Sequence, residues 1–483
     1  MRRPLWCSLA CLFLMLVTAA SAAAESPEVQ WTQAVGGTGS DMGYAVGLAH
    51  YGGYVVAGKT ASPGAAYVDI LFAKLDGSGD VAWQTNIGGA AEDVCNSVAR
   101  TSDGGYVLAG YTGVQPSYID YYLVKTNAAG EVQWSRTYGA TDVVEECASV
   151  IETSDGGLAL VGDAGYQIYL VKTDSEGMLE WEQTYHGGSG SDHCYSLTQC
   201  SDGGFALVGW RSTGSLTPTH DMMVIKVGPE GAFQWRRLFD SGVEDRGHRI
   251  IQLADGDYVV GGSTGNFSLW KLAPNGSLRW QHTYGTPTND VCLGFDAASD
   301  GGYLLGGYTY DYDLGYEFYA VRTDADGDLL WEETYGGALW DYSWDLTATD
   351  DEGWLLVGTT QSYGSGGNDL YALKLGPDAS GTGVDEASVA APRVQLSRPT
   401  PNPFTAGTKL GFSLEIPASV ELSVYDVAGR RVRRLWSGAA DAGPHDVMFD
   451  GSGDDGTELG AGVYFCRLTA HGETLTRKLL LLR

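Results

Sequence analysis

The stretch SDGGYVLAG at residues 102–110 decides the fold, because close copies of it recur along most of the chain. A tryptophan follows each of the first six copies, 18 to 26 residues after the copy ends. The related glycine-bounded apolar segments lie at 52–58, 156–162, 203–209, 257–262, 301–307 and 353–358. The tryptophans are Trp31, Trp83, Trp134, Trp181, Trp235, Trp280 and Trp331. Two independent markers in constant order predict seven copies of one unit.

Each copy divides into four short apolar segments separated by turn residues. In the second copy these segments are residues 94–101, 106–110, 121–126 and 132–138. Repeats of this length with four strands each are typical of a β-propeller, whose radial closure protects the edges of its sheets. The sequence therefore predicts an all-β chain that contains a seven-bladed β-propeller.

The two ends of the repeat array predict how the ring closes. The chain enters the array with a tryptophan strand around Trp31, whereas the last copy, residues 341–375, contains no such strand. We therefore expect the N-terminal strand to supply the fourth strand of the seventh blade.

Composition and charge limit the possible partners. The chain has 483 residues, with 69 Gly, 28 Tyr and 14 Trp, and 29 Lys and Arg against 60 Asp and Glu. Such an acidic chain lacks the basic surface that nucleic acid requires. Nearly all of the excess acidity falls in residues 25–398, which hold 18 basic and 50 acidic residues.

The N-terminus has the features of an export signal. Arg2 and Arg3 precede a short apolar run, and small residues at 20–24 offer a cleavage site. No other stretch is long enough to span a membrane as an apolar helix. We expect a signal peptide at 1–24, the propeller at 25–376, a linker at 377–395 and a small β-sandwich at 396–483, in a secreted or cell-surface protein.

One carboxylate recurs at an equivalent position in every copy, just before the first strand. Two roles that do not exclude each other are open: it accepts hydrogen bonds from its own loop, and it contributes to a ring of negative potential at the channel mouth. Such a ring could hold a cation such as calcium, or a basic peptide; no other cofactor is predicted. The ring residues are Asp41, Asp93, Glu145, Asp192, Asp245, Asp290 and Asp341.

A cationic series also recurs, on the third strand of each copy. We expect its apolar stems to lie on the sheet with their charged ends near a carboxylate, and a polar or acidic residue lies five positions earlier in each copy. The series comprises Lys74, Lys125, Lys172, Lys226, Lys271, Arg322 and Lys374. Four cysteines fall on the first strands, where we expect small buried thiols rather than disulfides.

The loops between the second and third strands vary in length and are rich in tyrosine. In a propeller they share one face with the loops that enter the first strands. A rigid scaffold with one variable loop set is a common way to build a binding surface, here suited to a glycan or a protein ligand. Alternatively, these residues only make the loops soluble. The candidate binding residues are Tyr67, Tyr118, Tyr310, Tyr312 and Tyr363.

The spacing Gly-x-x-x-Trp-x-x-x-x-Gly recurs four times, for example at Gly79, Trp83 and Gly88. It resembles the tryptophan-docking repeat of quinoprotein-like propellers and their non-enzymatic relatives. That resemblance implies that each tryptophan packs between neighbouring blades, and it does not extend to a cofactor site.

The last 85 residues carry a second pattern. PNPF at 401–404, VYD at 424–426, GR at 429–430 and AGVY at 461–464 resemble the C-terminal sorting domain of type IX secretion cargo, which is similar to the Ig-like domain of flagellar hook-capping proteins. The resemblance implies a bacterial protein that the secretion machinery carries to the outer cell surface. An ordinary Ig-like accessory module is the alternative.

Together these patterns favour an exported binding protein over an enzyme. No acid pair stands out from the sevenfold repeat. The alternative function is a secreted enzyme, either a quinoprotein-like oxidoreductase or a carbohydrate-active hydrolase, that uses the acidic channel mouth.

Overall fold

The computed structural model describes residues 26–482 with gaps at 62–66, 115–117, 141, 188–189, 213–219, 286–289, 312–314, 379–393, 397–398, 400–401, 403, 415–416, 427–429, 455 and 471–472. The predicted signal peptide and most of the predicted linker lie outside these residues. The chain divides into two compact units, residues 1–381 and 382–483. No helix in the described part of the chain is long and apolar enough to cross a membrane.

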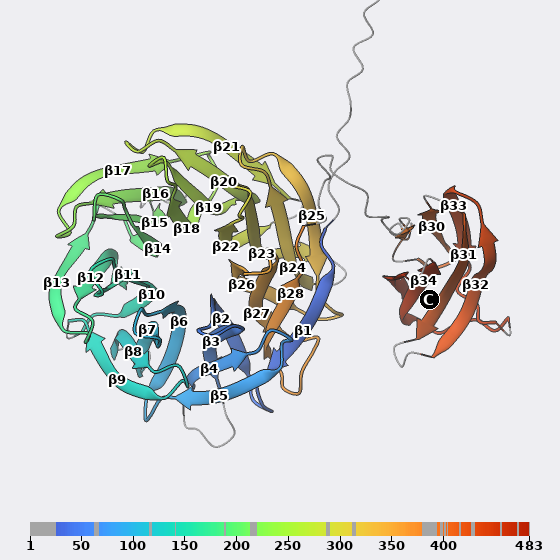
Figure 1. Cartoon of the computed structure of the whole chain (residues 1–483), viewed down its shortest axis with the longest axis horizontal. Coiled ribbons are helices and arrows are strands. Elements are labelled where there is room, and N and C mark those ends of the chain that lie inside the picture. Colours follow the sequence, from blue (N-terminus) through green and yellow to red (C-terminus); the bar gives the residue numbers. More distant parts are fainter. Residues whose placement is uncertain are drawn as a thin grey trace, which may run out of the picture. The chain divides into compact units, whose positions relative to one another are not determined.

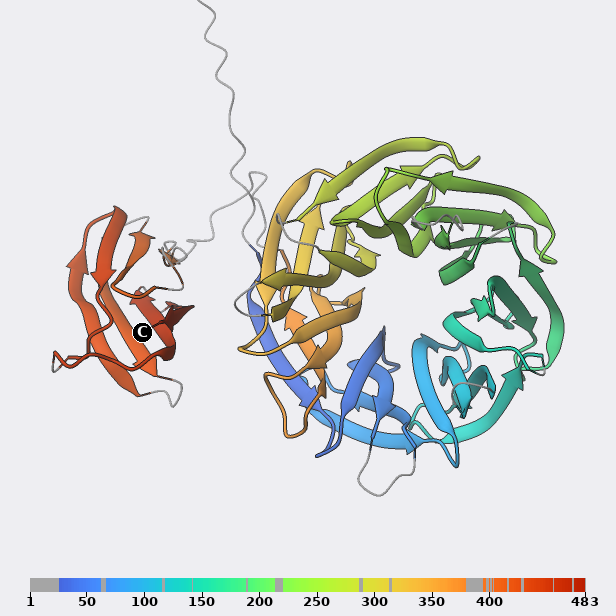
Figure 2. The same ribbon diagram turned by 180° about the vertical axis from the view of Figure 1, so that it is seen from behind.

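The first unit consists of seven four-stranded antiparallel sheets arranged around a central axis (Figures 1 and 2), as the repeats predict. Blade one is β2 (Asp41–Leu48), β3 (Tyr54–Thr60), β4 (Asp69–Leu75) and β5 (Val81–Ile87). Blade two is β6 (Glu92–Arg100), β7 (Tyr106–Val114), β8 (Tyr118–Thr126) and β9 (Val132–Tyr138). Blade three is β10 (Glu145–Glu152), β11 (Leu158–Ala164), β12 (Gln167–Thr173) and β13 (Leu179–Tyr185).

The remaining blades repeat this order. Blade four is β14 (Asp192–Gln199), β15 (Phe205–Ser212), β16 (His220–Val227) and β17 (Phe233–Phe239). Blade five is β18 (Asp245–Gln252), β19 (Tyr258–Thr264), β20 (Phe267–Leu272) and β21 (Leu278–Tyr284). Blade six is β22 (Val291–Ala297), β23 (Tyr303–Asp311), β24 (Gly315–Thr323) and β25 (Leu329–Tyr335). Blade seven is β26 (Asp341–Ala348), β27 (Trp354–Thr360), β28 (Asp369–Leu375) and β1 (Val29–Val35).

The N-terminal strand closes the ring, as the two ends of the repeat array predict. β1 pairs antiparallel with β28, with Trp31 opposite Lys374 and Val35 opposite Leu370. Figure 1 shows β1 along the outer edge of blade seven, beside β28. The first and last strands of the propeller therefore hold each other in one sheet.

The hydrophobic core is divided among the contacts between neighbouring blades. Seven clusters of buried residues each combine strands of two adjacent blades, and one of them joins Val46 of blade one to Leu370 of blade seven. The six described cysteines are buried free thiols, as expected. Because each cluster depends on two blades, the blades stabilise one another around the ring.

The repeated tryptophans pack between blades, as the docking resemblance implies. Each of the first six lies against the glycine of the turn between the third and fourth strands of the next blade. A Cβ atom added to Gly177 would lie 2.7 Å from the Trp134 ring, and Gly177 has φ of +74°. This turn therefore requires glycine for both its backbone conformation and the close approach of the ring.

At the seventh junction a side chain replaces the missing turn. β1 comes from the other end of the chain, so blade seven has no turn after β28 against which Trp331 could pack. Instead Asp378, just past β28, accepts a hydrogen bond of 2.9 Å from Trp331 Nε1 and pairs with Arg322 Nε at 2.5 Å. Arg322 is 1% exposed.

Buried cations on the third strands pair with aspartates of the SDGG-type turns. We call each such pair a blade latch. The prediction that the charged end lies near a carboxylate is confirmed for five of the seven cations, but the partner is not the residue five positions earlier. Five residues of strand span roughly 16 Å, which places that residue at the opposite end of the sheet. The latches are Lys125–Asp103, Lys172–Asp155, Lys226–Asp202, Arg322–Asp300 and Lys374–Asp351, with separations of 2.7 to 3.1 Å.

The second unit is a small β-sandwich around its own core. One sheet contains β29 (Val394–Leu396), β30 (Thr408–Leu414) and β33 (Gly443–Phe449). The other contains β32 (Arg431–Ala440), β31 (Ala418–Asp426), β34 (Gly462–Ala470) and β35 (Glu473–Leu481), in that order. Alternate residues of β31, such as Val420, Leu422 and Val424, point into the core, as the alternation of the sequence predicts.

Candidate functional site: the channel mouth and the central cavity

The first strand of each blade is its inner strand. The loops that enter these inner strands and the loops between second and third strands meet on one face of the propeller. Backbone hydrogen bonds join the two sets: Asp93 N donates to Val68 O at 2.9 Å, and Ser212 N donates to Ser191 O at 2.8 Å. We call this face, with the end of the central channel that opens on it, the channel mouth. The predicted assignment of the loops to one face is therefore correct.

The seven carboxylates of the predicted ring lie at this face, but they are buried. Each is between 0 and 4% exposed. In six of them the carboxylate accepts a hydrogen bond from an amide of its own loop. These amides belong to Gly37 for Asp41, Gly89 for Asp93, Ala140 for Glu145, Gly187 for Asp192, Ser241 for Asp245 and Gly337 for Asp341, at 2.6 to 3.0 Å.

The burial of Asp290 matches that of the other six acids. Burial raises the pKa of both Glu145 and Asp245. Within the described residues, no group of three or more His, Cys, Asp or Glu side chains is arranged to hold a metal ion. This geometry favours loop capping, the first of the two roles considered for these acids, and cation binding stays a prediction.

The candidate tyrosines differ in their surroundings. Tyr67 is 42% exposed. Tyr363 is 43% exposed; its ring stacks on Tyr371 at 5.1 Å, and its hydroxyl donates to Gly336 O at 3.0 Å. Tyr118 belongs to β8, but its side chain lies outside the described part, as does all of Tyr312. Among the candidates whose side chains the structure describes, Tyr310 is the one that joins a group of five aromatic residues at the channel mouth.

This group, which we call the aromatic patch, covers the channel mouth at blades six and seven. Tyr316 is its centre, with ring centroids 5.0 Å from Tyr310, 5.3 Å from Tyr308, 5.6 Å from Trp340 and 4.8 Å from Tyr342. Trp340 is 47% exposed. Of these five residues, sequence analysis listed Tyr310 alone as a candidate binding residue. The segment WDYSW at 340–344, which has no counterpart in the other copies, was the available signal.

Polar and charged groups occupy the mouth at blades three to five. His193 Nδ1 lies 2.5 Å from an Asp163 carboxylate oxygen, and the His193 ring stacks on Trp210 at 4.1 Å. The Arg246 guanidinium lies over the Trp210 ring, 5.5 Å from the ring centroid. Arg246 also pairs with Glu244 at 3.2 Å. We call these five residues the charged network.

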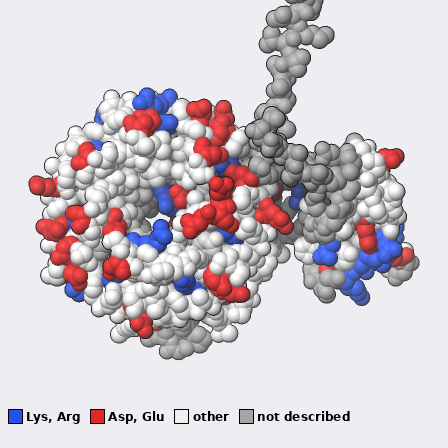
Figure 3. Space-filling model, viewed as in Figure 1, with Lys and Arg blue, Asp and Glu red and all other residues white. Residues whose placement is uncertain are grey.

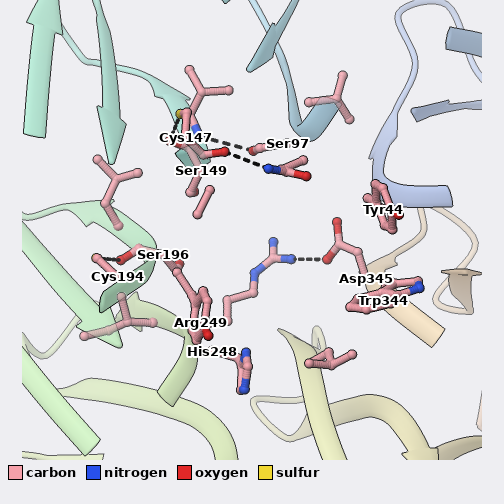
Figure 4. A pocket seen from close by; sticks show the side chains of 18 of the residues that line it. Tyr44, Ser97, Cys147, Ser149, Cys194, Ser196, His248, Arg249, Trp344 and Asp345 are labelled. Atoms are coloured by element: carbon pink, nitrogen blue, oxygen red, sulfur yellow. Dashed lines mark hydrogen bonds and ion pairs between the residues drawn. The ribbon is translucent and has the colours of Figure 1, made fainter. Parts of the chain in front are cut away.

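A cavity of about 830 Å³ occupies the central channel between these two regions (Figure 4). Its walls are mainly the inner strands, and they include Tyr44, Tyr195 and Trp344 together with serines and both charges of an ion pair. The pair joins Arg249 Nη1 of β18 to Asp345 Oδ1 of β26 at 2.7 Å. It reaches from blade five to blade seven across the inner strand of blade six.

Burial raises the pKa of Asp345, while the nearby Arg249 guanidinium opposes the increase. The carboxylate also accepts hydrogen bonds from the backbone amides of Val46, at 3.1 Å, and Leu346, at 2.9 Å. Sequence analysis did not single out Arg249 or Asp345. They lie 96 positions apart in the chain and follow none of the repeated patterns.

Comparisons with solved structures find similar chains at low identity. A protein of unknown function from Bacteroides caccae is 13% identical, with a TM-score of 0.40, over 58% of this chain and 93% of that chain. PorZ, a bacterial surface component of the type IX secretion system of Porphyromonas gingivalis, is 13% identical, with a TM-score of 0.42, over 93% of this chain and 60% of that one. Sqt1 from Chaetomium thermophilum is 14% identical, with a TM-score of 0.44, over 75% of this chain and 87% of that one.

No curated protein sequence matches the chain. A family model matches part of the second unit, within the segment that the sequence patterns assigned to a hook-capping type of sandwich. Residues 399–473 match the FlgD Ig-like domain, and this match confirms the C-terminal resemblance.

Proposed function

We propose that the protein is an exported binding protein that presents the channel mouth to a glycan, and that its C-terminal domain directs it to the outer cell surface. The observation that carries the proposal is the division of the mouth into the aromatic patch on blades six and seven and the charged network on blades three to five. A sugar ring has an apolar face and a rim of hydroxyl groups. Aromatic side chains suit the face, and charged groups suit the rim.

The proposal can be tested on a glycan array with the chain from residue 25 onward. We expect binding of one or more glycans, and a loss of at least about tenfold in affinity for Trp340→Ala, because Trp340 is the most exposed ring of the patch. Tyr51→Ala is the matched control. Tyr51 is 94% exposed but belongs to the turn between β2 and β3, on the opposite face.

Two results would contradict the proposal: no glycan bound by the native chain, or equal binding by the Trp340 variant. Incubation of each bound glycan with the protein, followed by mass spectrometry, distinguishes binding from catalysis. Release of a shortened or oxidised product would favour the alternative enzyme function.

The proposed role of the C-terminal domain rests on the match over residues 399–473 and on the sequence patterns that resemble sorting domains. Residues 396–483 can be fused to an exported reporter in a bacterium that has the type IX machinery. We expect the reporter on the cell surface, where added protease removes it. A fusion that stays in the periplasm would favour an ordinary accessory module.

A further inference from the structure

The cavity in the channel combines cationic with acidic side chains, the acids being Glu146, Asp163 and Asp345. Figure 3 shows blue side chains within the central opening of a face on which red side chains otherwise predominate. Two of the residues that line the cavity are cationic, Arg246 and Arg249, and both belong to β18 of blade five. A cation in a narrow, partly desolvated channel attracts anions more strongly than one on an open surface.

The inner strands show that Arg249 is an exception to the repeat. It occupies the fourth position after the ring carboxylate, where the other blades have small or acidic residues. The equivalent residues are Ala45, Ser97, Ser149, Ser196, Arg249, Gly294 and Asp345. Blade six has glycine at this position, and a Cβ atom on Gly294 would lie 3.4 Å from Asp345 Oδ1. The missing side chain gives the ion pair room to cross in front of blade six.

Two of the three acidic residues that line the cavity already have partners. Asp345 is bonded to Arg249 and to two backbone amides. Asp163 is paired with His193 and accepts a hydrogen bond from Cys194 N at 2.9 Å. Burial, followed by the negative charges of Asp163 and Glu92, raises the pKa of Glu146. Asp345 and Asp163 therefore add less negative charge to the cavity than unpaired carboxylates would.

Arg249, in contrast, is held in place by one of its nitrogen atoms and has further hydrogen-bond donors that it does not use. Its Nη1 atom donates to Asp345 and contacts Leu346 O, while Nε and Nη2 have no hydrogen-bond partner among the described residues. Its side chain is 33% exposed. The Nε and Nη2 atoms form one flat edge of a guanidinium, which matches the two oxygens of a carboxylate.

We propose that the channel cavity is a second binding site, which takes a small carboxylate-bearing sugar with its carboxylate on the Nε–Nη2 edge of Arg249. The choice of a sugar rests on the proposed function, whereas the choice of a carboxylate rests on Arg249. Tyr44 and Trp344, whose rings meet edge to face at 5.3 Å beside Asp345, provide an apolar wall for the sugar ring. Figure 4 shows both side chains next to the Arg249–Asp345 pair.

The test compares glucuronate with glucose by saturation-transfer NMR on the chain from residue 25 onward. The two sugars differ in one carboxylate, so binding to the guanidinium edge predicts a preference of about 10- to 100-fold for glucuronate. The double variant Arg249→Gln/Asp345→Asn removes both charges together, and it should abolish the preference. Arg136→Gln is the matched control, because Arg136 lies on the outer strand β9.

Equal binding of the two sugars, no binding of glucuronate, or an unchanged preference in the double variant would overturn the proposal. If the double variant does not fold, Arg249→Lys replaces it, since lysine keeps the positive charge but has no flat edge; it should lose most of the preference. Trp340 does not line the cavity. Glucuronate binding that survives Trp340→Ala therefore separates this site from the glycan surface at the mouth, and failure of either proposal leaves the other testable.

Discussion

The blade latches and the channel-facing positions of the inner strands lie in the same seven blades, but they differ in how far they repeat. The latches are nearly identical, with a buried cation against an aspartate in five blades. The fourth position of the inner strand, in contrast, includes alanine, serine, arginine, glycine and aspartate. Contacts that repeat in most blades maintain the ring, while positions that differ between blades are free to build one specific site.

The largest effect should come from a repeated contact between blades. Gly177→Ala places a Cβ atom 2.7 Å from the Trp134 ring on a backbone with φ of +74°. We expect a loss of about 2–4 kcal/mol in the free energy of unfolding, from backbone strain and overpacking together. Gly156→Ala is the control, because Gly156 has φ of +84° but no atom within 4 Å of the added Cβ.

Urea unfolding of both variants measures the part that belongs to tryptophan docking. Gly156→Ala should lose only about 1 kcal/mol, the cost of the backbone conformation alone. Equal losses would mean that docking contributes nothing.

A smaller loss should follow a change at the one junction that departs from the repeat. Asp378→Ala removes the hydrogen bond to Trp331 and one of the two acidic partners of the buried Arg322. We expect a loss of about 1–3 kcal/mol in the free energy of unfolding. Asp378→Asn keeps an acceptor for Trp331 and should lose less. If Asp378→Ala unfolds like the native chain, Asp378 does not secure the seventh junction.

The latches also predict how stability depends on pH. A hydrogen bond from Thr153, opposed by burial and followed by bonds from Gly157 and Lys172, lowers the pKa of Asp155 to about 2, from an ordinary value of 3.8. A carboxyl whose pKa falls on folding stabilises the native state above its unfolded pKa, and that stabilisation is lost as pH falls from about 4 to 2.

We therefore expect Asp155→Asn to lower the Tm by less than about 2 °C at pH 7, because the carboxylate is largely exposed. The difference from the native chain should shrink as the pH falls from 5 to 2. Thermal unfolding followed by circular dichroism at a series of pH values measures it. A difference that does not change with pH would mean that the charge of Asp155 contributes nothing to stability.

The smallest effects belong to the inner strands. Ser97 Oγ accepts a hydrogen bond from Val150 N at 3.1 Å, so Ser97→Ala should cost about 1 kcal/mol. Ser149 occupies the same position in the next blade, but its hydroxyl makes no hydrogen bond with the described residues. Ser149→Ala should therefore stay within about 0.5 kcal/mol of the native stability. Urea unfolding of the two variants tests the contrast, and equal losses would contradict it.

The structural features that rest on repeated or alternating sequence patterns could be predicted. The seven blades, the closure by β1, the docking of the tryptophans and the sandwich of the second unit all follow from patterns that a single chain displays. The latches were predicted only in part. The cations were recognised, but their aspartates lie in another turn, which strand pairing rather than sequence distance brings close.

The channel site could not be predicted in the same way. Arg249 and Asp345 come together because the ring brings blades five and seven around a glycine of blade six. The aromatic patch likewise combines β23, β24 and the start of β26. Neither arrangement recurs among the described residues, so the sequence contains no repeated spacing from which it could be predicted.

The pairing of β1 with β28 also has a consequence for the order of events during synthesis and export. Some 330 residues separate the two strands, so β1 is synthesised long before β28, the strand with which it pairs. Until then both strands have an unpaired edge, which invites proteolysis and aggregation. A chain that stops short of Leu375 cannot close, and we expect cells to degrade such fragments rather than display them.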